Sequence, residues 1–160
     1  MKNEITVKAF FLSIFLSIIL SSAMTYLGLY AGMTISASIP AAIMSMGILR
    51  LFKESNILEN NIVQTAASAG ESLAAGVIFT LPALLLVGYW DTISYWEVTK
   101  IAMVGGILGA LFTVPLRRAL ILKAQLRFPE GVATAAVLKT GHETDAEKSQ
   151  KSLKMIGFSA

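Results

Sequence analysis

The chain has 160 residues, of which 55% are hydrophobic and 14% charged, and its formal net charge is +3. Soluble domains carry about 25% charged residues, so this deficit and several long apolar runs indicate a membrane protein. The absence of cysteine excludes disulfides and thiolate metal sites, and a single histidine excludes a histidine-based zinc site. The positive charges lie beside predicted membrane segments, where topology explains them, so we expect no nucleic-acid partner.

Two predicted membrane spans open the chain. The first, residues 9–30, contains no charged residue and is long enough to cross a bilayer. The second, residues 33–52, is rich in serine, alanine and glycine, which let helices approach closely in lipid. Gly32 is expected to form the turn between them. Pro40 should kink the second span or start a new helical segment within it.

The third predicted span, residues 60–88, has an apolar second half and a polar first half. Its polar residues recur at spacings of three and four, which places them on one face of a helix: Asn61, Gln64, Thr65, Ser68, Glu71 and Ser72. Gly70, Gly76 and Pro82 are the expected points at which so long a helix bends or breaks. Polar groups at membrane depth face protein or water rather than lipid, so this stretch is predicted to line a transport path.

The fourth predicted span covers residues 98–116. Gly105 and Gly109 form a GxxxG pair, which is typical of packed membrane helices. Arg117 and Arg118 follow it, and we interpret them as anchors at the cytoplasmic edge.

A shorter helix is predicted over residues 129–140, either amphipathic or half-inserted in the membrane. Pro129 is suited to its first position and Glu130 to its first turn. Residues 141–152 are predicted to form a polar loop, and residues 153–160 to begin a further span. We therefore expect the chain to be a fragment of a longer protein.

The distribution of charged and aromatic residues predicts the orientation. With a cytoplasmic N-terminus and four crossings, Lys100 is the one basic residue of 13 that faces outward, as the positive-inside rule requires. The aromatic residues expected in a belt at the outer interface are Tyr26, Tyr30, Tyr89, Trp90, Tyr95 and Trp96. The predicted location is the inner or plasma membrane of the cell, as a multi-pass protein.

Four motifs carry a resemblance to a known family. They are TISASIPAA at residues 34–42, ENNIVQTAASAGESLAAGVIFTLPAL at 59–84, PLRR at 115–118 and FPEGVATAAVLK at 128–139. In this order they resemble the N-terminal part of the oligopeptide transporter (OPT) family, most of all its bacterial and yellow-stripe-like branch. The resemblance implies a proton-coupled secondary transporter of small peptides or of metal-chelate complexes such as siderophores. It also implies that remaining helices, or other subunits, complete the substrate cavity.

Glu71 is the sharpest functional candidate. A charged carboxylate at the centre of a membrane helix costs about 2.5–3.5 kcal/mol. A carboxyl that is neutral when occluded and charged when exposed to water can carry a proton. The alternative is a structural carboxyl that bonds to a neighbouring backbone or hydroxyl group.

The other candidates also have two interpretations. Asn60, Asn61, Gln64, Thr65, Ser68 and Ser72 offer amide and hydroxyl partners to a substrate, or to neighbouring helices. Glu130 fits a carboxylate at a helix start, and the resemblance adds a role in gating or binding.

We therefore predict an all-α polytopic transmembrane helix bundle that acts in secondary transport, with no cofactor and no bound metal. A membrane enzyme would need a nucleophile–base pair or a metal cluster, and the sequence shows neither. The remaining alternative is a non-transporting assembly or regulatory subunit that uses its glycine-rich helix faces to bind partner helices.

Overall fold

The computed structural model describes residues 5–52 and 56–142, and in this part of the chain every regular element is a helix. The elements are α1 (Val7–Ala31), α2 (Ser38–Leu49), α3 (Ile57–Thr80), α4 (Pro82–Leu86), α5 (Tyr95–Leu116), the π-helix η1 (Arg117–Lys123) and a last helix over residues 129–142. The predicted all-α class is confirmed. Most of the predicted polar loop, and the predicted further span at 153–160, lie outside the described residues.

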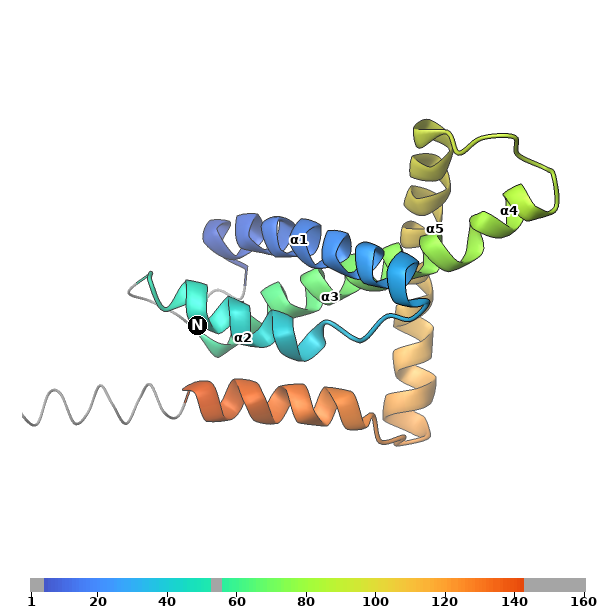
Figure 1. The fold of residues 1–160 in the computed structure, drawn as a ribbon. Coiled ribbons are helices and arrows are strands. Elements are labelled where there is room, and N and C mark those ends of the chain that lie inside the picture. Colours follow the sequence, from blue (N-terminus) through green and yellow to red (C-terminus); the bar gives the residue numbers. More distant parts are fainter. Residues whose placement is uncertain (1–4, 53–55, 143–160) are drawn as a thin grey trace, which may run out of the picture.

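Helices α1 and α3 form the core pair and lie side by side over much of their length (Figure 1). Leu16 and Leu20 of α1 and Val63 and Ala67 of α3 are buried in one apolar cluster. The close approach depends on Gly70, where a Cβ atom would overlap the Ser17 hydroxyl and lie 3.2 Å from Ser17 Cβ. A small residue at this position therefore sets the helix separation.

Helix α2 is shorter than the span expected over residues 33–52. Gly32, with a φ of +70°, ends α1, residues 33–37 are not helical, and α2 begins at Ser38. Pro40 explains the start, because a residue without an N–H fits only the first turn of a helix. Twelve helical residues extend about 18 Å, less than the ~30 Å of bilayer hydrocarbon. The four crossings stay a prediction.

The long central helix breaks at Pro82 and runs unbroken through Gly70 and Gly76. Helix α3 ends at Thr80, and α4 begins at Pro82. Proline removes a backbone donor and clashes with the preceding turn, whereas an isolated glycine leaves the hydrogen-bond ladder intact. Together α3 and α4 remain long and apolar enough to cross a membrane.

Helix α5 runs across the direction of α1, α2 and α3 (Figure 1). None of its residues is buried within the described part of the chain. Arg117 and Arg118 do not end the helical path, which continues as η1 to Lys123 just after Pro115. Three described helical stretches are therefore long and apolar enough to cross a membrane: Val7–Ala31, Ile57–Leu86 and Tyr95–Lys123.

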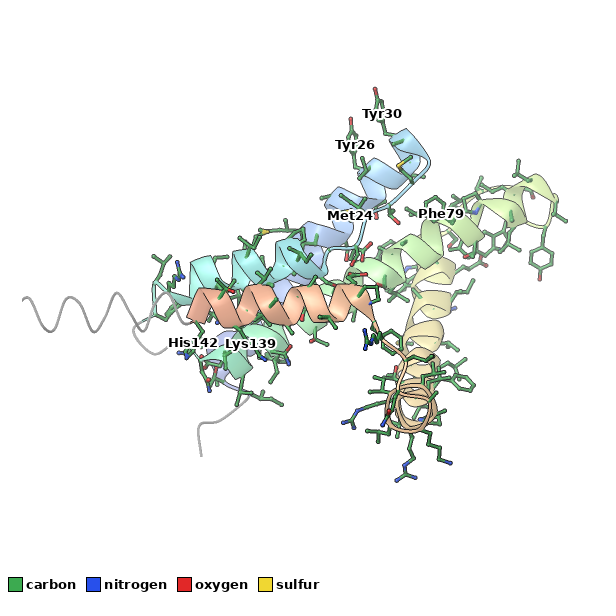
Figure 2. The ribbon with its side chains drawn as sticks, turned by 90° about the horizontal axis from the view of Figure 1, so that it is seen from below. Met24, Tyr26, Tyr30, Phe79, Lys139 and His142 are labelled. Carbon is green, nitrogen blue, oxygen red and sulfur yellow. The ribbon has the colours of Figure 1, made fainter. Side chains whose placement is uncertain are left out.

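The helix over residues 129–142 lies beside α2 and runs in the same direction (Figures 1 and 2). Contacts at both ends fix this arrangement. The Ser36 hydroxyl donates to the Glu130 carboxylate at one end, and Arg50 Nη2 donates to the Gly141 carbonyl, at 3.3 Å, at the other. This pairing brings Glu130 to the start of α2, beside the middle of α3.

Candidate functional site

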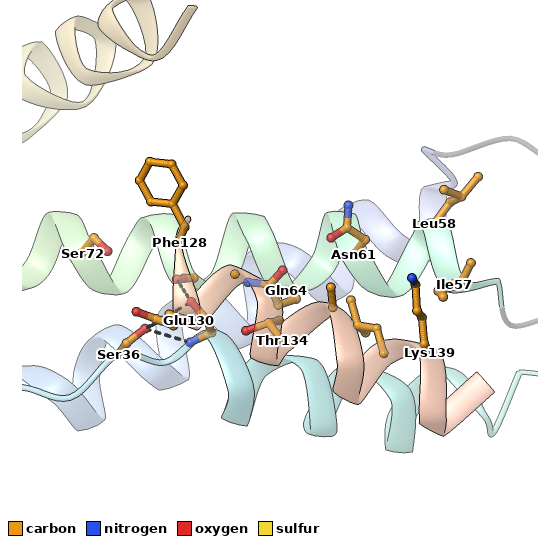
Figure 3. Close-up of a pocket in the computed structure, with 15 residues that line it drawn as sticks. Ser36, Ile57, Leu58, Asn61, Gln64, Ser72, Phe128, Glu130, Thr134 and Lys139 are labelled. Atoms are coloured by element: carbon orange, nitrogen blue, oxygen red, sulfur yellow. Dashed lines mark hydrogen bonds between the residues drawn. The ribbon is translucent and has the colours of Figure 1, made fainter. Parts of the chain in front are cut away.

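A pocket of about 620 Å³ opens between α3, the start of α2 and the helix over residues 129–142 (Figure 3). Its polar lining comes from Ser36, Ser38, Asn61, Gln64, Ser68, Ser72, Glu130, Thr134 and Lys139. Its apolar lining includes Ile57, Leu58, Phe128, Ala135 and Leu138. A concave site that combines an apolar wall with a few converging polar groups is typical of small-molecule binding.

Hydroxyl groups join the three elements at one end of the pocket. Ser36 donates to Glu130, the Ser36 and Ser38 hydroxyls lie 3.1 Å apart, and the Ser38 and Ser68 hydroxyls lie 3.0 Å apart. The hydrogen bond from Ser36, followed by that from Ser38, lowers the pKa of Glu130 below its ordinary value. The Glu130 side chain is therefore a carboxylate at neutral pH.

The backbone explains why a carboxylate is stable here. Glu130 lies in the first turn of its own helix, and Ser36 and Ser38 lie where α2 begins. Both helix N-termini present unpaired N–H groups and a positive dipole end, which favour an anion. Ser68 is 11 residues into α3, about 16 Å from the start of that helix, so the cluster lies well inside the length of the central span.

The pocket gathers five of the eight residues selected from the sequence: Asn61, Gln64, Ser68, Ser72 and Glu130. Asn60 and Thr65 are elsewhere. Asn60 is buried beside α2, where its carbonyl accepts from the Ser45 hydroxyl at 3.2 Å. The Thr65 hydroxyl is exposed and donates to the Asn61 carbonyl of its own helix at 2.7 Å.

Glu71 is also outside the pocket. Its side chain is 4% exposed, and its carboxylate accepts a long hydrogen bond of 3.4 Å from the Ser72 hydroxyl. At about 100° per residue, the six selected positions from Asn61 to Ser72 spread over an arc of about 120°, wider than a single face. Glu71 occupies the edge of that arc on the same side as buried Ala67. The structure thus separates the two acidic candidates into different environments.

Sequence reasoning missed four polar residues of the pocket: Ser36, Ser38, Thr134 and Lys139. Thr134 is 5% exposed, and its hydroxyl has no hydrogen-bond partner among the residues that the structure describes. The spacing of Glu130, Thr134 and Leu138, four residues each, was a usable signal, because such positions share one helix face. No comparable signal connected the serines to Glu130, which follows them by more than 90 residues.

A second polar cluster lies at the start of α3, outside the pocket lining. The Glu59 carboxylate accepts from the Thr6 hydroxyl at 2.6 Å and lies 3.6 Å from Lys8 Nζ. Glu59 also completes a capping box with Asn56, which starts α3. This cluster ties the beginnings of α1 and α3 together. Within residues 5–52 and 56–142, no group of acidic and histidine residues could hold a metal ion.

Apolar helices of membrane length, a proline-broken central helix and a polar pocket along the first two thirds of that helix fit a membrane protein of the transporter class. The chain belongs to the OPT oligopeptide transporter family, because the family model described as "OPT oligopeptide transporter protein" matches residues 4–160. Members of this family are transporters and not enzymes.

Two relatives show which transporters the chain is similar to. It is 49% identical over 122 residues to a "Putative oligopeptide transporter" of Haemophilus influenzae, a match that covers 76% of this chain and 19% of that protein. It is 38% identical over 63 residues to a "Probable metal-nicotianamine transporter YSL4" of Arabidopsis thaliana, covering 39% of this chain and 9% of that protein. The matched part of the chain thus spans about a fifth of the first relative's length and about a tenth of the second's. No solved structure gives a significant match.

Proposed function

We propose that this chain forms part of the substrate path of a proton-coupled secondary transporter, which carries oligopeptides or metal-chelate complexes across the cell membrane. The pocket carries this proposal, because it combines Asn61, Gln64 and Ser68 of α3 with Glu130 inside the length of a membrane-crossing helix. The names of the two relatives supply the two substrate classes. Further helices, from the same polypeptide or from other subunits, would complete the cavity around the exposed faces of α3 and α5.

Alternating access requires elements that can move relative to each other. The non-helical segment 33–37 contributes Ser36 to the pocket wall, and the Pro82 break interrupts the central helix beyond the Ser72 end of the pocket. Interrupted helices around a site inside the membrane are typical of secondary transporters. We place the N-terminus and the start of α3 on the cytoplasmic side. The pocket then extends along α3 from that side toward the outer side, as far as Ser72.

The test is uptake into vesicles that contain the complete transporter. Labelled tripeptides, tetrapeptides and ferric chelates are supplied with and without an inward proton gradient. We expect at least one class to accumulate, and to accumulate more with the gradient. A broad panel with no uptake would reject the transport function, and uptake that ignores the gradient would reject proton coupling.

A non-transporting assembly subunit is the second candidate, and α5 is the observation that favours it. Among the described residues nothing buries a side chain of this helix, and a Cβ atom at Gly105 or Gly109 would meet none of their atoms within 4 Å. Such a smooth face suits a partner helix. If this role is correct, substitutions in the pocket leave transport by the assembled complex unchanged, whereas Gly105→Leu abolishes assembly.

A further inference from the structure

The pocket is electrically polarised along the helix over residues 129–142. Glu130 lies at one end and Lys139 at the other, and both side chains line the same cavity (Figure 3). The two residues are nine positions apart, which corresponds to about 13.5 Å along a helix axis. A ligand that spans the pocket therefore meets a carboxylate at one end and an ammonium group at the other.

Neither charge is neutralised within the part of the chain that the structure describes. Glu130 accepts hydrogen bonds from Ser36 and Ser38, which orient the carboxylate and leave its charge in place. Lys139 has no ion-pair partner there. Hydrogen bonds in which one partner is ionised are shorter and stronger than neutral ones, so both groups can bind a ligand group of opposite charge.

Thr134 lies between the two charges, one helical turn from Glu130 and just over one turn from Lys139. Its hydroxyl is buried, lines the pocket and lacks a hydrogen-bond partner among the described residues. Buried polar groups are normally satisfied, so an unpaired hydroxyl in a cavity wall indicates that a ligand completes its hydrogen bonding. This observation is independent of the two charges.

We propose that Glu130 and Lys139 bind the amino and carboxyl termini, respectively, of one linear peptide, and that the Thr134 hydroxyl bonds to its backbone between them. Extended chains advance about 3.3–3.6 Å per residue, so a peptide of about four residues matches the spacing. Leu58, Phe128 and Leu138 supply an apolar wall for its side chains. The inference rests on the proposed transport function and narrows its substrate to zwitterionic peptides rather than compact chelates.

The test compares equilibrium binding of tetra-alanine to the purified complete transporter in three forms: free, N-acetylated and C-amidated. A charge-assisted contact predicts that each cap weakens binding by about tenfold or more. Glu130→Gln should remove the penalty for N-acetylation and retain that for amidation, and Lys139→Gln should do the reverse. Glu97→Gln and Lys100→Gln, exposed residues outside the pocket, should keep both penalties.

Thr134 provides a variant that separates binding from folding. Thr134→Val keeps the shape of the side chain and removes an unsatisfied hydroxyl, so the thermal midpoint of the unliganded protein should stay the same or rise. Its affinity for free tetra-alanine should fall severalfold, and Thr134→Ser should retain most of the affinity. Unchanged affinity in Thr134→Val would overturn the contact at the middle of the pocket.

Binding and uptake together distinguish the two proposals. If capping either terminus weakens binding as predicted but the protein does not accumulate peptides, the binding mode is supported and the transport function is rejected. If the protein takes up peptides but binds capped and free peptides equally well, the transport function is retained and the binding mode is overturned. The binding mode is also overturned if no tetrapeptide binds, or if the cap penalties persist unchanged in Glu130→Gln and Lys139→Gln.

Discussion

Glu71 and Glu130 are the two acidic residues near the middle of the central helix, and their surroundings differ. Glu130 is exposed to the pocket and accepts hydrogen bonds from serine hydroxyls, which stabilise its charged form. Glu71 is buried outside the pocket, with a long hydrogen bond from Ser72. A carboxylate that is stabilised and open to the pocket can hold a cationic group, whereas the proton role of Glu71 stays a prediction from the sequence.

Substitution of Glu71 tests the proton role. Glu71→Gln keeps the size and hydrogen-bonding capacity of the side chain but removes its titration. Proton-driven accumulation should be lost, while exchange of labelled for unlabelled substrate across vesicles should persist. Glu97→Gln, an exposed residue in the first turn of α5, serves as the control. If Glu71→Gln still accumulates substrate in response to the proton gradient, a group other than Glu71 carries the coupled proton.

The lowered pKa of Glu130 predicts a pH dependence. A carboxyl whose folded-state pKa is depressed contributes stability that is complete above its unfolded pKa, and this stability disappears as the pH falls through the folded value. The thermal midpoint of the wild type should therefore exceed that of Glu130→Gln at neutral pH, and the difference should shrink at acid pH. Because Glu130 is exposed, the difference should be small.

Ser36→Ala gives the matched comparison, because Ser36 makes the largest contribution to the lowered pKa of Glu130. In the Ser36→Ala background, the stability lost through Glu130→Gln should be smaller than in the wild type, and its disappearance should be complete at a higher pH, because the folded-state pKa of Glu130 lies closer to its unfolded value. Thermal midpoints measured across the acid range check both statements. A difference between wild type and Glu130→Gln that does not change with pH would show that the carboxylate charge does not contribute.

At the scale of elements, the sequence predicted the helices that follow from local rules. The uncharged run of α1, the proline break at Pro82 and the start of the last helix at residue 129 depend on nearby residues. A new helical segment near Pro40 was one of two expectations and agrees with the start of α2 at Ser38, but the non-helical residues 33–37 and the continuation of α5 into η1 were not predicted. Both depend on how far a helix extends on either side of a proline, which composition and charge do not determine.

The packing of α1 against α3 gives a test at this scale. Gly70→Val should destabilise the protein by about 1–3 kcal/mol, because added atoms must displace Ser17 and separate the helices. Gly76→Val is the matched control on the same helix, since a Cβ there would meet no atom of residues 5–52 or 56–142 within 4 Å. Thermal unfolding in detergent measures both variants. Equal midpoints for the two would contradict the account of Gly70 as the contact that sets the helix separation.

For the whole molecule, the sequence predicted that part of α3 contributes polar side chains to a common site, but it could not predict how they assemble with the other elements. Asn61, Ser68 and Ser72 follow from the spacing along α3. The meeting of Ser36, Ser68 and Glu130 depends on three segments far apart in the chain, and no local pattern encodes their packing. The pocket is therefore a property of the tertiary structure.

Orientation can be tested on the whole molecule by cysteine labelling, because this chain has no cysteine. Ser94→Cys, at the start of α5, should react with a membrane-impermeant thiol reagent from outside intact cells. Gln125→Cys, just after η1, should react only after the membrane is opened. The reverse labelling pattern would invert the proposed orientation, and labelling of both positions from outside would reject a crossing by α5.

The most direct measurement asks whether the polar side of α3 faces a solute path. Ser72→Cys lies in the pocket, and Phe79→Cys lies on the same helix outside it, with a native side chain that is 49% exposed. In the complete transporter, with any other cysteines replaced, a water-soluble thiol reagent should modify Ser72→Cys and not Phe79→Cys, and tetra-alanine should slow that modification. A Ser72→Cys thiol that resists the reagent, or that reacts equally with and without peptide, would contradict the assignment of this pocket to the substrate path.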